Sequence, residues 1–66
     1  MNVSYDKKRD IMRIKFQEGE YDISKETDEG LIIDMTKDHK IIAIEILDAS
    51  EKIPRKSLNE VNIIAS

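Results

Sequence analysis

Cysteine and tryptophan are absent from this 66-residue chain, which also holds only one proline and two glycines. Without cysteine, the chain can form neither disulfides nor thiolate metal sites. With Gly19 and Gly30 far apart in the sequence, a glycine-rich phosphate-binding loop is excluded as well. A chain this short buries only about 60% of its unfolded surface, so we expect association with another chain to supply the missing stability.

Long apolar runs are also missing. The longest run, Ile41 to Ile44, has four residues, whereas a bilayer-spanning helix needs about 20, and no N-terminal segment resembles a secretory signal. The formal charge of -3 argues against a general affinity for nucleic acid or anionic membranes, because that affinity depends on excess cationic charge. The sequence therefore predicts a soluble cytosolic protein with a single domain over residues 1–66.

The chain does have the two-residue alternation that is typical of β-strands. Residues 1–5 and 10–16 alternate apolar and polar side chains. A loop of Asp6 to Arg9 between them would form a hairpin that pairs Val3 with Met12. The apolar side chains of both strands then share one face.

A short third strand is expected at residues 21–24, where Tyr21 and Ile23 alternate with polar residues. A loop over 17–20 would pair Phe16 with Tyr21 and set this strand beside the second one. Because only two apolar residues support it, an irregular sheet edge is the alternative.

β-branched residues predict the strongest hairpin, between residues 31–35 and 41–47. With Asp38-His39 as a two-residue turn, each apolar residue of one strand faces another across the hairpin. The predicted pairs are Leu31 with Ile46, Ile33 with Ile44, and Met35 with Ile42.

The predicted strands together give one sheet with two faces. The first face forms the predicted core and holds Val3, Tyr5, Met12, Ile14, Phe16, Leu31, Ile33, Met35, Ile42, Ile44 and Ile46. The second face carries charged side chains, yet it also holds Ile11, Ile32, Ile41, Ala43 and Leu47. Exposed apolar surface of that size is typical of interfaces. We therefore interpret these five residues as a candidate dimer interface, with coverage by residues 53–65 of the same chain as the equal alternative.

The C-terminal stretch has helix signals. Asp48 followed by Glu51 resembles a helix-opening capping box, and Pro54 limits that helix to about one turn. The same spacing at 57–60 favours a second helix over 57–62, with an extended tail at a sheet edge as the alternative. The predicted fold class is α+β, a small antiparallel β-meander of four or five strands with a short C-terminal helical segment.

Several motifs carry a family resemblance. They are Tyr5-Asp6, Asp10 at the start of a strand, Ile33-Asp34, Asp38 in a turn, and Ile44-Glu45-Ile46-Leu47-Asp48-Ala49-Ser50. Over residues 5–50 they resemble the domain of unknown function 2283 family, small proteins with an early Tyr-Asp, an Asp-rich turn and a closing Gly-Ile-Glu-Ile-Leu-Asp-Ala-Ser phrase. The chain departs from that pattern at Arg13, often aromatic, and at His39 and Ala43, where the family often has Gly. The family brings no established activity, and some relatives look like one of two co-encoded proteins, which implies an antitoxin-like role by analogy.

Three carboxylates, Asp34, Glu45 and Asp48, form a candidate metal site. In the predicted register Asp34 and Glu45 project diagonally from the second face, about 7 Å or less apart at their β-carbons. Two carboxylates that close could bind a divalent cation or share a proton. The other interpretation is that each pairs with Arg13 or Lys15 and closes a polar patch.

Other chemistry finds less support in the residues. His39 is the single histidine and lies at a predicted turn tip, which favours a solvated residue over a general base. No serine lies in a Gly-x-Ser-x-Gly elbow. The basic run Lys7-Lys8-Arg9 lacks the interleaved aromatic side chains that stack on nucleic acid bases.

These observations favour a small cytosolic, non-catalytic protein-interaction module that forms a homodimer and uses no cofactor. A metal-binding protein or hydrolase-like enzyme that uses Asp34, Glu45 and Asp48 is the first alternative. An antitoxin-like partner of a co-encoded protein is the second. We expect no membrane partner and no nucleic acid partner.

Overall fold

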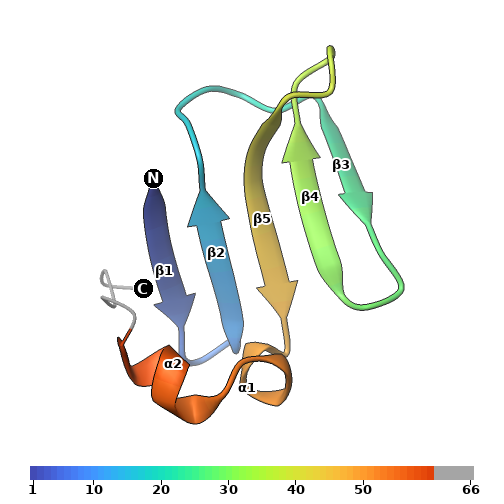
Figure 1. The fold of residues 1–66 in the computed structure, drawn as a ribbon. Helices are drawn as coiled ribbons and strands as arrows, with labels where there is room; N and C mark the ends of the chain where they lie inside the picture. The colour runs from blue at the N-terminus through green and yellow to red at the C-terminus, as the bar shows by residue number, and fades with distance from the viewer. Residues whose placement is uncertain (61–66) are drawn as a thin grey trace.

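The computed structural model describes residues 1–60, and residues 61–66 lie outside that part. Five strands form one antiparallel sheet, and two short helices follow (Figure 1). The elements are β1 (Asn2–Asp6), β2 (Ile11–Lys15), β3 (Ile23–Glu26), β4 (Leu31–Met35), β5 (Ile41–Leu47), α1 (Ala49–Lys52) and α2 (Arg55–Glu60). The predicted α+β fold class is confirmed. In the described part, no helix is long and apolar enough to cross a membrane.

Strand β5 lies at the centre of the sheet, whose order is β1-β2-β5-β4-β3. It is the longest strand and almost entirely apolar, so it suits a position with a paired neighbour on each edge. Strand β3 lies at the far edge, where Ile23 pairs with Met35 of β4. The expected pairing of Phe16 with Tyr21 is therefore wrong. The edge of β2 that faces away from β1 pairs with β5 instead. The chain between residues 16 and 22 therefore passes β5 and β4 to reach the far edge of the sheet.

The β1–β2 hairpin keeps the expected face but has a shifted register. Val3 pairs with Ile14 rather than with Met12. The loop runs over residues 7–10, one residue later than expected, because Asp10 takes a left-handed conformation with φ 57°. A shift of two residues leaves the apolar side chains on the same face.

The β4–β5 hairpin matches the prediction except at its bulge. Met35 pairs with Ile41 instead of Ile42, because the register shifts after Asp34. Since directly paired residues share a face, Ile41 lies on the first face rather than the second. Two of the three expected pairs are confirmed: Leu31 with Ile46, and Ile33 with Ile44.

The turn between β4 and β5 has three residues, so the two-residue turn at Asp38-His39 is wrong. The Thr36 N–H donates to the Lys40 carbonyl at 2.9 Å, and the His39 N–H donates to the Thr36 carbonyl at 3.0 Å. Within this turn only His39 has a positive φ, 66°. Such a conformation is costly for a residue with a Cβ.

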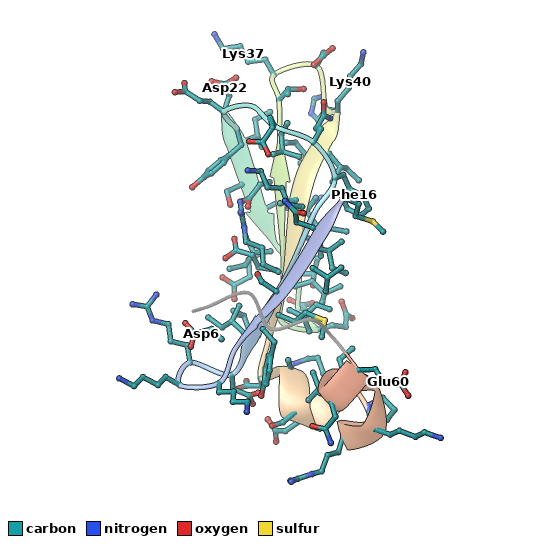
Figure 2. All side chains as sticks on the ribbon, turned by 90° about the vertical axis from the view of Figure 1, so that its left-hand side faces the viewer. Asp6, Phe16, Asp22, Lys37, Lys40 and Glu60 are labelled. Carbon is teal, nitrogen blue, oxygen red and sulfur yellow. The ribbon has the colours of Figure 1, made fainter. Side chains whose placement is uncertain are left out.

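Helices α1 and α2 pack against one end of the first face. We call this end of the sheet the helical end. Ala49 and Leu58 are buried there with Met12, and Val3, Tyr5, Ile46 and Ile53 pack against them. Figure 2 shows that α2, which carries Glu60, lies on the same side of the sheet as Phe16. The predicted second helix is confirmed as far as Glu60. Residues 53–60 thus contribute to the first face, and residues 61–65 lie outside the described part.

Candidate functional site

The first candidate site joins the start of β2 to the start of α1 through Asp10. The Asp10 carboxylate accepts hydrogen bonds from Tyr5 Oη at 2.5 Å, from Ser50 Oγ at 2.6 Å and from the Ser50 N–H at 3.0 Å. The Asp10 carbonyl accepts the Ala49 N–H at 2.9 Å. We call Tyr5, Asp10 and Ser50 the Asp10 latch, because they tie the first hairpin to the helices.

Asp10, and not Asp48, satisfies the first N–H groups of α1. The capping-box interpretation of Asp48 is wrong, since its side chain makes no cap hydrogen bond and its φ is 50°. Sequence reasoning missed the contact between residues 10 and 50 because no local pattern reports it. The available signal was that both residues lie in the motifs that carry the family resemblance.

The chemistry of the Asp10 latch is structural. Hydrogen bonds from Ser50 and Tyr5 lower the pKa of Asp10, and the bond to Asp10 raises the pKa of the Tyr5 hydroxyl. The latch therefore ties β1, β2 and α1 together.

The second candidate site lies on the second face, where Asp34 and Glu45 come together as expected. The Asp34 side chain is 2% exposed, and its Oδ1 accepts the Ser24 hydroxyl at 2.7 Å. Asp34 Oδ2 is buried without a hydrogen-bond partner. The expected ion pair with Arg13 is present, but Nη2 lies 3.9 Å from Oδ2, too far for a hydrogen bond.

The pKa of Glu45 is raised in this environment. Burial raises the pKa of Glu45, and hydrogen bonding to Asp34 and the Asp34 charge raise it further, while the Arg13 charge lowers it. Two ionised carboxylates cannot hydrogen-bond to each other, so only the protonated form of Glu45 could donate to Asp34. Asp34 of β4 and Glu45 of β5 therefore favour the neutral form of Glu45.

Asp48, the third residue of the candidate metal site, does not join Asp34 and Glu45. Asp48 is exposed at the β5–α1 junction, and His39 is exposed at the tip of the β4–β5 turn. Over residues 1–60, no group of three His, Cys, Asp or Glu side chains is placed to hold a metal ion. Asp34 and Glu45 alone supply fewer oxygen atoms than the roughly six to eight that Ca²⁺ takes.

The five candidate interface residues lie in different environments. Ala43 is fully buried, so it offers no surface to a partner. Ile11, Ile32 and Leu47 are half-buried on the second face. Ile41 is 41% exposed, but its register places it on the first face.

The first face carries two of the exposed large apolar side chains, Phe16 and Ile41. Phe16, which we expected in the core, is 44% exposed. Around it, away from the helical end, the first face carries half-buried isoleucines of the three central strands. We call this set the open patch, and it consists of Ile14, Phe16, Ile33, Ile41 and Ile44.

One antiparallel sheet with two short helices at one end defines a small α+β protein. Residues 2–50 match the family described as protein of unknown function (DUF2283), so the chain belongs to that family, as its motifs predicted. Comparisons with curated proteins and with solved structures gave no match.

Proposed function

We propose that the chain is a small cytosolic, non-catalytic protein-interaction module that acts as a homodimer through its open patch. The observation that carries the proposal is the uncovered apolar surface on the first face. Phe16 and Ile41 are its most exposed members, and Ile14, Ile33 and Ile44 extend it across the central strands. Contiguous apolar surface of this kind marks interaction sites on soluble proteins.

The single-layer architecture of the sheet supports the same proposal. The helices cover only one end of the first face, so the rest of that face has no second layer. A second copy on the open patch would supply the layer that a single sheet lacks.

The open patch suits an interface better than the other surfaces do. The second face has the half-buried side chains of Arg13 and Glu45 at its centre, and a partner seated there would have to desolvate both. The β3 edge is four residues long, and Ser24, Lys25 and Glu26 on it are exposed, as in edges that resist strand pairing.

The test is the solution mass by light scattering over a wide concentration range. We expect a dimer, and we expect Phe16→Glu to raise its Kd by at least about tenfold, since a charge would be buried in the interface. Lys37→Glu is the control, because it adds a carboxylate at an exposed turn position outside the patch. A monomer at all concentrations contradicts the proposal.

An interface on the second face, as the sequence suggests, makes a different prediction. If that face is the interface, Ile32→Thr weakens the dimer and Phe16→Glu does not. If the partner is a co-encoded protein, the purified chain is monomeric and forms a 1:1 complex with that protein, which Phe16→Glu weakens.

A further inference from the structure

Strand β3 is a four-residue strand at one edge of the sheet (Figure 1). Within residues 1–60 it pairs with β4 alone, and the hydrophobic cluster at the helical end includes none of its residues. Ser24, Lys25 and Glu26 are exposed, and Ile23 is half-buried. Such an element, with little apolar burial, opens locally at a low cost in free energy.

The two glycines of the chain, Gly19 and Gly30, lie on either side of β3. Both have a positive φ, 133° and 84°. Hinges are a few loop residues that absorb large changes in φ and ψ, and glycine tolerates such changes because it has no Cβ. Residues 20–29, which contain β3, therefore have a permissive joint next to each end.

Strand β3 also covers a carboxylate whose hydrogen bonding is incomplete. Asp34 of β4 is buried and pairs directly with Ser24 of β3, whose hydroxyl donates to Oδ1 at 2.7 Å. Asp34 Oδ2 is buried without a hydrogen-bond partner in the described structure, and Arg13 Nη2 lies 3.9 Å away, beyond hydrogen-bonding distance. A buried carboxylate oxygen without a donor raises the free energy of the closed sheet.

Water can reach Asp34 without unfolding of the whole molecule. On one side Asp34 pairs with Ala43, which is fully buried at the centre of the sheet. On the other side it pairs with Ser24 of the edge strand. Movement of β3 away from β4 would therefore hydrate Asp34 while β1, β2, β4 and β5 stay paired.

We propose that residues 20–29 open away from β4 as one unit while the other four strands remain folded, and that the incomplete hydrogen bonding of Asp34 favours the opened state. We call this segment the β3 gate. Opening replaces the charged edge of β3 by the edge of β4, where Leu31, Ile32 and Ile33 follow one another. Apolar edges with unpaired backbone groups readily pair with other strands. The β3 gate is independent of the open patch and of the homodimer proposed there.

Native-state hydrogen exchange measured by NMR tests the β3 gate. Two backbone bonds close it: the Asp22 N–H donates to the Met35 carbonyl at 2.9 Å, and the Thr27 N–H donates to the Leu31 carbonyl at 2.8 Å. The reference is the Phe16 N–H, which donates to a carbonyl of β5 at 2.8 Å. After correction for intrinsic rates, we expect Asp22 and Thr27 to exchange at similar rates, at least about tenfold faster than Phe16.

Ser24→Ala removes the hydroxyl that donates to Asp34. A hydrogen bond to a charged group is then missing from the closed state and unchanged in the opened state. We therefore expect the exchange rates of Asp22 and Thr27 to rise by at least about tenfold.

Ser50→Ala is the matched control, because the Ser50 hydroxyl also donates to a carboxylate, that of Asp10, at 2.6 Å. This bond lies at the helical end and stays intact when the β3 gate opens. The variant should raise the exchange rate of Phe16 and leave the rates of Asp22 and Thr27 within about twofold of the wild type.

Glu45→Gln acts in the opposite direction and keeps the proposal testable if Ser24→Ala does not fold. Its amide can donate to Asp34 Oδ2, so we expect exchange at Asp22 and Thr27 to slow by at least about threefold. Glu26→Gln, on the exposed carboxylate of β3 itself, is its control and should leave both rates unchanged.

Three results would overturn the β3 gate. Equal exchange rates at Asp22, Thr27 and Phe16 would mean that β3 opens only when the whole sheet unfolds. An effect of Ser50→Ala at Asp22 and Thr27 as large as at Phe16 would mean the same. Rates at Asp22 and Thr27 that respond to neither Ser24→Ala nor Glu45→Gln would mean that the strand ends fray while Asp34 stays buried.

Discussion

Ser50 donates its hydroxyl hydrogen bond to Asp10 over a distance of 2.6 Å, although forty residues separate the two in the sequence. This bond and its neighbours connect the first hairpin to the helices that follow the last strand. We expect Ser50→Ala to lower the melting temperature by at least about 4 °C, the shift that loss of one ordinary hydrogen bond causes in a domain of this size. Thermal unfolding by circular dichroism measures it.

The matched control for this prediction is Asp28→Asn, which changes an exposed loop carboxylate. It should leave the melting temperature unchanged. Equal effects of Ser50→Ala and Asp28→Asn would mean that the Asp10 latch contributes no stability.

Asp10 and Glu45 should give opposite pH dependence. Because the folded pKa of Asp10 is lowered from 3.8, its stabilising contribution is present above that pH and is lost as the pH falls through the folded value. Because the folded pKa of Glu45 is raised from 4.5, its contribution is present below that pH and is lost as the pH rises through the folded value. Carboxyl-carbon NMR titration measures both groups.

Glu45→Gln separates the two contributions. A glutamine amide can donate to Asp34 Oδ2 at every pH, so we expect the variant to melt about 2–4 °C above the wild type at pH 7 and at the same temperature near pH 4. Melting curves over pH 3–8 test this. A pH-independent difference would show that Glu45 does not carry the proton.

Leu58 is 6% exposed and is the main contact of α2 with the sheet. Leu58→Ala should cost about 2 kcal/mol or more, which in a chain of this length is a large share of the total stability. We expect the melting temperature to fall by at least about 8 °C. Asn59→Ala, on the exposed neighbour, is the control and should change it little.

His39 has a positive φ of 66° at the tip of the β4–β5 turn. Glycine adopts this conformation without the steric cost that a Cβ imposes. We expect His39→Gly to raise the melting temperature by about 2–5 °C. Lys37→Gly, at a turn position with negative φ, should lower it, and a rise in both variants would contradict the explanation.

The alternation of side chains predicted the strands and faces well, because face assignment tolerates register errors of two residues. Val3 was expected opposite Met12 and pairs with Ile14, yet it lies on the expected face. The bulge after Asp34 is an odd shift, and it therefore moved Ile41 to the other face. The sequence has no glycine or other residue typical of a bulge at that position.

Strand order was not predictable in the same way. Phe16 and Tyr21 are compatible with a hairpin between β2 and β3, but β5 offers β2 a longer apolar partner from a distant part of the chain. Of the candidate sites, the diagonal register predicted the proximity of Asp34 and Glu45. The burial of Asp34 was not predictable. Ser24 of β3 donates to its Oδ1, and the position of β3 follows from the strand order, while Oδ2 is left without a partner.

The central position of β5 also determines when the sheet can form. β1–β2 and β3–β4 are local hairpins, but no hydrogen-bonded strand pair joins them until β5 is inserted between them. Isolated two-stranded hairpins are at best marginally stable. During synthesis the first 40 residues would therefore leave the ribosome as two unjoined hairpins, and cooperative folding would begin only when residues 41–47 become available to both.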